Sequence, residues 1–223
     1  STVSTFFPLT ICAIVTAGLG YWIIPILRQL KAGQIIREDG PQAHLQKAGT
    51  PTMGGIFFVP VAVAIALLLY NFNPNVIAVC SITIAYSFIG WLDDRQILRR
   101  KSNKGISPKT KLGLQVGFAA LFCLWLGWSQ PSTITNLALP FGLMLPLGFL
   151  FWPLAAFVLL AESNATNLTD GVDGLMGGFG AIAFLGLGLY LAPEFPELTI
   201  FCACTSGSCL GFLAHNRNPA KVF

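Results

Sequence analysis

Residues 75–95, Asn-Val-Ile-Ala-Val-Cys-Ser-Ile-Thr-Ile-Ala-Tyr-Ser-Phe-Ile-Gly-Trp-Leu-Asp-Asp-Arg, run without a charge as far as Leu92 and then end in Asp93-Asp94-Arg95. A helix of about 20 apolar residues is long enough to cross the hydrocarbon core of a bilayer. The whole chain has the same character: hydrophobic residues make up 54% of it, charged residues only 10%, and the mean hydropathy is +0.70. Because a soluble domain carries about a quarter charged residues, this composition indicates an integral membrane protein.

Further apolar stretches of similar length lie on both sides of this one. The predicted spans are residues 6–27, 54–71, 75–92, 112–129, 144–161, 175–192 and 197–214. Pro146 and Pro153 interrupt the fifth, but neighbouring helices can satisfy the backbone groups that a proline frees. All six cysteines fall within spans, which predicts buried thiols. We therefore predict an all-α, polytopic integral membrane helical bundle of about seven transmembrane helices, with residues 1–223 forming a single transmembrane domain.

The basic residues are segregated between the loops. If successive loops alternate between the two sides of the membrane, all 13 Lys and Arg residues fall on one side, in residues 28–53, 93–111, 162–174 and 215–223. The loops of the other side, residues 1–5, 72–74, 130–143 and 193–196, contain none. The positive-inside rule then places the basic loops in the cytoplasm, the N-terminus outside and the C-terminus inside. We expect a multi-pass protein of the cell inner (cytoplasmic) membrane.

Polar motifs gather in the loops of the basic side. His44–Gly55, with the sequence HLQKAGTPTMGG, places a cation, Lys47, shortly before the second span. Its glycines and prolines favour a tight entry into the helix, and Thr50 and Thr52 are predicted to cap that helix. The N–H groups at such a helix start can meet an anion. The motif is equally consistent with a capped helix start that binds nothing.

Two groups of carboxylates lie on the same side. Adjacent Asp93 and Asp94 suit a general base or a pair that shares a divalent ion, although a solvated helix end would look the same. Asp170 and Asp173 would share a face if helical, whereas in a turn the glycine between them would let the backbone approach a ligand. Phosphate chemistry joins these parts, because carboxylates can hold Mg²⁺ while lysines clamp diphosphate oxygens. No P-loop, kinase glycine loop or Rossmann fingerprint is present.

Three motifs in order resemble the phospho-N-acetylmuramoyl-pentapeptide transferase family, within the polyprenyl-phosphate sugar-phosphate transferases. They are His44–Gly55, then Asp93-Asp94 with Lys-Gly-Ile at 104–106 and Lys111, and Asn164–Leu175 (NATNLTDGVDGL). The resemblance implies a membrane enzyme of about ten helices that is active on its cytoplasmic side. Such an enzyme transfers phospho-N-acetylmuramoyl-pentapeptide from UDP-N-acetylmuramoyl-pentapeptide to undecaprenyl phosphate, giving lipid I and UMP in peptidoglycan synthesis, with Mg²⁺ as cofactor.

The resemblance also implies roles for individual residues. Asp93 is similar to the carboxylate proposed to deprotonate the lipid phosphate, with Asp94 beside it as a second catalytic candidate. Phe223 matches an aromatic residue that stacks near the uracil. The full set of implied substrate-binding residues is Lys47, Thr52, Lys111, Asn167, Asp170, Gly171, Asp173, Asn216 and Phe223. No metal ligand is assigned, a homodimer is a possible assembly, and no nucleic-acid partner is expected.

The sequence departs from the family pattern at its end. It stops at Phe223, before the family's third acidic motif, so we expect this chain to be inactive alone. Two alternatives remain open: a related UDP-N-acetylhexosamine polyprenyl-phosphate transferase, and a non-catalytic, cation-binding or transporter-like membrane subunit. A transporter would place its acidic groups near the bilayer midplane, whereas here they lie at predicted helix ends on one side.

Overall fold

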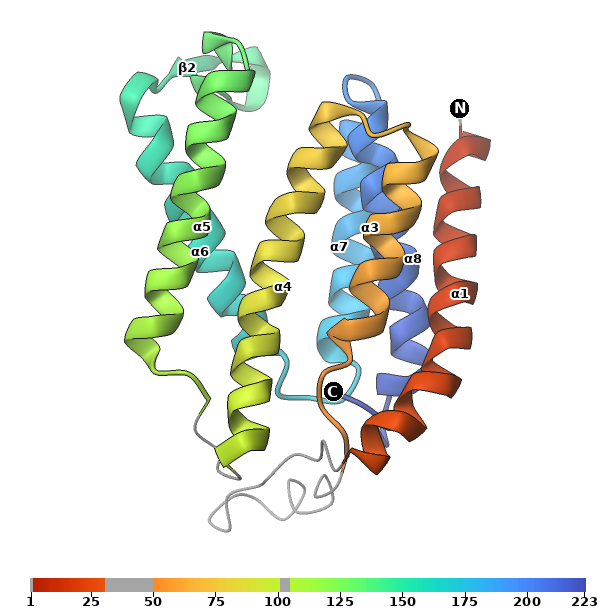
Figure 1. The fold of residues 1–223 in the computed structure, drawn as a ribbon. Helices are drawn as coiled ribbons and strands as arrows, with labels where there is room; N and C mark the ends of the chain where they lie inside the picture. The colour runs from red at the N-terminus through yellow and green to blue at the C-terminus, as the bar shows by residue number, and fades with distance from the viewer. Residues whose placement is uncertain (1, 31–49, 101–104) are drawn as a thin grey trace. The chain divides into compact units, whose positions relative to one another are not determined.

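The computed structural model describes residues 2–30, 50–100 and 105–223. Within these ranges the chain forms seven α-helices (Figure 1). They are α1 (Thr2–Gln29), α3 (Gly55–Leu69), α4 (Pro74–Arg100), α5 (Pro108–Ser129), α6 (Phe151–Thr169), α7 (Leu175–Leu191) and α8 (Pro196–Asn216). Five of them, α1, α4, α5, α6 and α8, are long and apolar enough to cross a membrane, while α3 and α7 are shorter apolar helices. The predicted all-α, polytopic membrane fold is confirmed.

Two predicted helix boundaries were wrong. The fifth span was expected at residues 144–161, but α6 begins at Phe151 and ends at Thr169, and α4 continues past Asp93-Asp94 as far as Arg100. Hydropathy marks only the part of a helix that lies in hydrocarbon, whereas the backbone hydrogen bonds of the helix can continue beyond it. Asn164 and Asn167 are therefore helical, and the Asp93-Asp94 pair lies within α4 and not in a loop.

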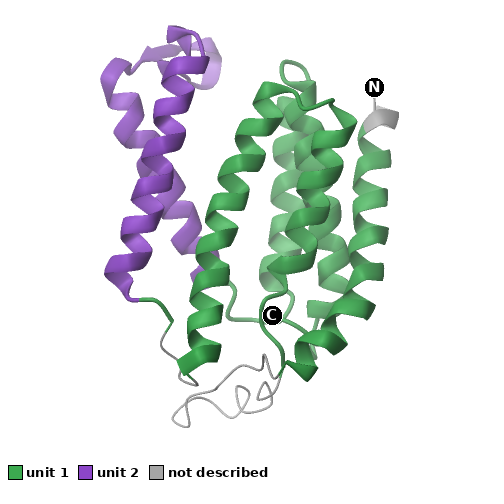
Figure 2. Ribbon diagram, viewed as in Figure 1, with its two compact units in different colours: residues 1–106, 169–223 green, residues 107–168 purple. Residues whose placement is uncertain are grey.

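The chain divides into two compact units, shown in Figure 2. Unit 2, residues 107–168, consists of α5, α6 and the segment between them. That segment contains β1 (Asn136–Ala138) and β2 (Met144–Pro146), an antiparallel pair that the sequence analysis did not predict. Short 3₁₀ turns at Ser132–Thr135, Pro140–Gly142 and Gly148–Leu150 flank the strands.

Unit 1, residues 1–106 and 169–223, contains α1, α3, α4, α7 and α8. α8 is its central helix and packs against the other four. Small residues allow the close approach: a Cβ on Gly207 would meet the backbone of Leu9 in α1, and one on Gly211 would lie 2.5 Å from the carbonyl oxygen of Ala13. Helices in membranes associate through such small-residue contacts, because lipid provides no hydrophobic drive between them.

Hydroxyl groups add hydrogen bonds between the helices of unit 1. Ser206 on α8 donates to the carbonyl oxygen of Ala181 on α7 at 2.7 Å, and Thr16 on α1 bonds Ser208 on α8 at 3.3 Å. All six cysteines are buried and free, as predicted, and Cys12 and Cys204 are fully buried in the core of this unit. Hydroxyl groups thus link α8 to α7 and to α1 by hydrogen bonds.

The two ends of unit 1 differ in what they carry. The C-terminal end of α4, the turn before α7 and the C-terminal segment all lie at one end, and the start of α1 lies at the other (Figure 1). The end that carries Phe223 therefore brings together segments that bear most of the predicted site residues. The helices of unit 1 act as the scaffold that positions them.

Candidate functional site

Three segments that are distant in sequence meet at this end of unit 1. They are Pro51–Gly54 before α3, Asp173–Gly174 before α7, and Asn216–Phe223, which starts at the last residue of α8; together we call them the motif junction. The backbone joins the first and last of them: the Phe223 N–H donates to the Pro51 carbonyl at 2.9 Å, and the Gly54 N–H donates to the Phe223 carbonyl at 2.7 Å. The first motif and the C-terminal segment are therefore paired like two short strands.

Side chains complete the junction. The Asn216 carboxamide donates to the Val222 carbonyl at 2.9 Å and accepts from the Gly174 N–H at 3.0 Å. The Asp173 carboxylate accepts from the Ala220 N–H at 3.1 Å. Asn216 is only 1% exposed and its bond to the Val222 carbonyl is buried, so an unpaired amide there would be costly. The acidic turn before α7 is thus tied directly to the segment that ends in Phe223.

Unusual backbone geometry also marks the junction. Met53 has φ 73°, a left-handed conformation that is rare for a residue with a side chain, and Gly174 has φ 77°. At Gly54 a Cβ would lie 2.5 Å from the Phe212 ring and 3.0 Å from the Phe223 carbonyl oxygen, so only glycine fits there. Strained backbone persists where surrounding contacts impose it, which is common at functional sites.

The predicted capping of α3 by Thr50 or Thr52 was wrong. The N-cap residue is Gly54, and no side-chain bond caps the helix. The reason is the pairing with Phe223, which holds Pro51 in a bridge and lets the chain turn into the helix only after Met53. Thr52 is half-buried within this segment.

Asp93 contacts Gly105 and Ile106 of the second motif. Its Oδ1 accepts a hydrogen bond from the Ile106 N–H at 2.8 Å, and its carboxylate packs directly against Gly105. Asp93 and Asp94 are both half-buried. One turn from Trp91, the Arg95 guanidinium lies 5.0 Å above the centre of the indole ring. The orientation of the Asp93 carboxylate is therefore fixed by a peptide group of the Lys-Gly-Ile segment.

The third motif is divided between the two units. Asp170, Gly171 and Asp173 belong to unit 1, where they lie in the turn between α6 and α7; the turn alternative for the two aspartates is the one the structure adopts. Asn167 lies on α6 and Lys111 lies near the start of α5, and both helices belong to unit 2. Lys47 lies outside the described residues.

Unit 2 contains a polar contact that the sequence analysis missed. The Gln115 carboxamide on α5 donates to the Ser163 hydroxyl at 3.1 Å and accepts from the Asn164 carboxamide on α6 at 3.1 Å. Asn164 also donates to the Leu160 carbonyl at 2.8 Å. A lone glutamine inside a predicted span was the available signal, because a polar group in a membrane helix needs an internal partner.

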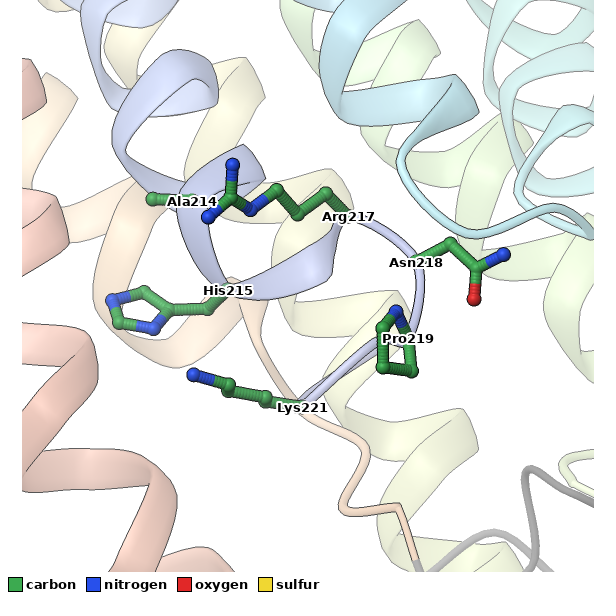
Figure 3. A pocket seen from close by; sticks show the side chains of 6 residues that line it. All are labelled: Ala214, His215, Arg217, Asn218, Pro219 and Lys221. Atoms are coloured by element: carbon green, nitrogen blue, oxygen red, sulfur yellow. The ribbon is translucent and has the colours of Figure 1, made fainter.

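A cavity of about 300 Å³ opens beside the C-terminal end of α8 (Figure 3). Its lining residues are Ala214, His215, Arg217, Asn218, Pro219 and Lys221. His215 is anchored on α1: its Nε2 bonds the Ala17 carbonyl at 2.8 Å, and its ring meets Tyr21 edge to face at 4.8 Å between centroids. Arg217 and Lys221 give the lining two cations, so it suits an anionic group.

The sequence of this chain matches known proteins. Residues 76–223 match the profile of glycosyl transferase family 4, and residues 47–59 match signature 1 of the phospho-N-acetylmuramoyl-pentapeptide-transferases. The chain belongs to glycosyl transferase family 4. The resemblance found in the three motifs is confirmed, and the signature covers the part of the first motif from Lys47 through the Gly54-Gly55 turn.

Curated relatives with the name phospho-N-acetylmuramoyl-pentapeptide-transferase extend the match over nearly the whole chain. The relative from Nostoc punctiforme is 69% identical over 221 residues, which cover 99% of this chain and 61% of the relative. The one from Microcystis aeruginosa is 64% identical over 223 residues, covering 100% of the chain and 62% of the relative. The chain thus spans about three fifths of the length of these relatives.

Proposed function

We propose that the full-length enzyme containing this chain transfers phospho-N-acetylmuramoyl-pentapeptide from UDP-N-acetylmuramoyl-pentapeptide to undecaprenyl phosphate, giving lipid I and UMP in peptidoglycan synthesis. The observation that carries the proposal is the 69% identity to a transferase of that name over 99% of the chain. The motif junction supports it, because it gathers Thr52, Asp173, Asn216 and Phe223 from three separate segments at one end of unit 1.

In the proposed reaction an oxygen of undecaprenyl phosphate attacks the sugar-linked phosphorus of the donor diphosphate. The bond from that phosphorus to the bridging oxygen breaks, and UMP leaves. Asp93 takes the proton from the lipid phosphate, with its carboxylate held in one orientation by the Ile106 N–H. Asp94 is the second catalytic candidate on the same helix. Phe223 provides an aromatic surface for the uracil, next to the Asn216 anchor.

The remaining substrate-binding residues have complementary charges and hydrogen-bonding groups. Lys47 and Lys111 are assigned to the diphosphate oxygens, since ammonium groups bind phosphate as point charges. Asn167, Asp170 and Gly171 are assigned to the uridine side of the donor. These assignments follow the family resemblance residue by residue, and the turn that holds Asp170 and Gly171 has an exposed backbone that a ligand can approach.

Mg²⁺ is the cofactor that we infer from the family. It would neutralise phosphate charge and orient the diphosphate oxygens when bound. Among residues 2–30, 50–100 and 105–223, however, no group of three or more His, Cys, Asp and Glu side chains is arranged to hold a metal ion. Because Mg²⁺ is commonly bound by one or two carboxylates together with waters and substrate phosphates, no metal ligand is assigned among these residues.

The proposed orientation places the motif junction at the cytoplasmic face of the inner membrane. All Lys and Arg residues fall in loops assigned to that side, and the start of α1 lies at the other end of unit 1 (Figure 1). The four aspartates Asp93, Asp94, Asp170 and Asp173 then lie toward the cytoplasm. This placement favours an enzyme over a transmembrane ion path. A single transmembrane domain and a possible homodimer remain part of the proposal.

The test is an exchange assay in detergent that follows radiolabelled UMP into UDP-N-acetylmuramoyl-pentapeptide in the presence of undecaprenyl phosphate and Mg²⁺. It is run on this chain and on a chain extended to the length of the relatives. Exchange in the extended chain alone supports both the transferase and the expected inactivity of residues 1–223. Exchange with UDP-N-acetylglucosamine in its place would favour the related hexosamine transferase. No exchange with either donor by folded extended protein would contradict the proposal.

A further inference from the structure

The polar contact between α5 and α6 in unit 2 is centred on Gln115. Gln115 is 1% exposed, and its carboxamide uses both its nitrogen and its oxygen to bond α6, through Ser163 and Asn164. Burying a carboxamide in an apolar helix pair is costly unless such partners are present. The contact therefore favours one register of α5 against α6, because sliding either helix by a turn would leave the buried Gln115 carboxamide without these two partners.

The same register determines where two substrate-binding residues lie. Lys111 precedes Gln115 by four residues on α5, and Asn167 follows Asn164 by three residues on α6, so each lies on the face of its helix that carries the polar contact. The two helices are joined by the β1–β2 segment and run in opposite directions (Figure 1). Lys111 and Asn167 are thus displaced from the contact toward the same end, by about 6 Å and about 4.5 Å along their helices.

We propose that Gln115 is a positioning residue for the UDP-linked donor: its bonds to Ser163 and Asn164 hold the α5–α6 register that sets Lys111 and Asn167 at one level. This proposal rests on the proposed function, in which Lys111 contacts the diphosphate and Asn167 the uridine side. Gln115 itself lies about one helical turn beyond Lys111 on α5, so we assign it no contact with the substrate. Its effect on the reaction passes through the two helices.

The effect is specific to one substrate. A change in register would move Lys111 and Asn167 relative to each other, and both bind the donor, so donor binding weakens more than acceptor binding. Displacing such a positioning group by about 1 Å can lower kcat/KM for the donor on the order of 100-fold. A purely structural role predicts something different, namely a loss of folded protein with unchanged kinetics in the fraction that folds.

The experiment uses the full-length enzyme and Gln115→Met, which keeps the side-chain length and removes both hydrogen bonds. We expect the KM for the UDP donor to rise about 10- to 100-fold, and the Kd for UMP measured by calorimetry to rise with it. The KM for undecaprenyl phosphate and kcat should change less than about threefold. The matched control is Thr16→Val, which removes another buried hydroxyl bond between helices, at 3.3 Å, and should leave all four constants unchanged.

A reciprocal exchange covers the case in which Gln115→Met does not fold. Gln115→Asn shortens one partner, and Gln115→Asn combined with Asn164→Gln restores the combined length of the pair. The proposal expects a raised donor KM in the single variant and recovery toward wild type in the double variant. An unchanged donor KM in folded Gln115→Met, or equal increases in the KM values for donor and acceptor, would overturn it. Wild-type enzyme without exchange activity would instead contradict the proposed function.

Discussion

Replacing Gly105 by alanine tests whether the loop contact of Asp93 matters for activity. A Cβ at Gly105 would overlap the Asp93 carboxylate and lie 2.6 Å from its Cγ. Real Cβ atoms do not approach other atoms so closely, so either the carboxylate or the loop must move. Either movement breaks the 2.8 Å bond from the Ile106 N–H to Asp93 Oδ1. The substitution adds a single methyl group and removes no polar group from the protein.

The size of the effect follows from the bond that is lost. A hydrogen bond to a charged group contributes about 1.5–3 kcal/mol. If that bond orients the carboxylate in the transition state, its loss lowers kcat/KM by about 10- to 150-fold, because each 1.36 kcal/mol corresponds to a factor of ten. The free energy of unfolding should fall by no more than the same amount, since the strained contact is relieved as the loop moves.

The assay compares kcat/KM of Gly105→Ala with that of Gly90→Ala in the full-length enzyme. Gly90 lies on the same helix as Asp93, and a Cβ there would meet nothing within 4 Å. We expect Gly90→Ala to keep wild-type activity and to gain up to about 1 kcal/mol of stability from its higher helix propensity. Activity of Gly105→Ala equal to that of Gly90→Ala would refute the idea that the loop orients Asp93.

Further substitutions at Asn216, Gly207 and Asp93 test the architecture around the site. Asn216→Ala should lower the free energy of unfolding by about 2–4 kcal/mol, because it removes the partner of the buried Val222 carbonyl and of the half-buried Gly174 N–H; thermal unfolding in detergent measures this. Gly207→Ala should destabilise by at least about 1–3 kcal/mol through overpacking against α1, whereas Gly18→Ala, with nothing within 4 Å, should be neutral by the same measurement. Asp93→Asn should keep the loop contact and lose turnover, whereas Asp93→Ala should also loosen the loop, as hydrogen exchange at Ile106 would report.

The sequence predicted the fold through local composition, and its errors have physical causes. Long apolar runs and the segregation of Lys and Arg are sufficient to predict a helical membrane protein. They do not show where a helix ends in water, which is why α4 and the C-terminal end of α6 were predicted too short. The start of α6 was predicted too early because the apolar residues 144–150 form β2 and a 3₁₀ turn. The hairpin of β1 and β2 was missed because its strands are only three residues each, and β2 lies within the predicted apolar span 144–161.

The candidate site was predicted as separate motifs because its connections are carried by backbone groups. The pairing of Phe223 with Pro51 and Gly54 uses only peptide N–H and C=O groups, which every residue except proline offers in full. Nothing in the side chains of positions 51 and 223 indicates that they meet. Gln115, by contrast, does carry a signal, because a polar side chain in a membrane helix indicates a partner on a neighbouring helix.

Two of the acidic residues share one kind of anchor, and this explains how the site can be both acidic and well ordered. Asp93 accepts a hydrogen bond from the Ile106 N–H, which lies just before α5. Asp173 accepts one from the Ala220 N–H, which lies just after α8. A peptide N–H brings no charge of its own, so it fixes the orientation of a carboxylate without placing a cation at the site. A lysine or arginine in the same position would hold the carboxylate equally well but would also neutralise it. Each of these two hydrogen bonds therefore orients its carboxylate without itself neutralising it, which suits the proton transfer or ion binding proposed for the site.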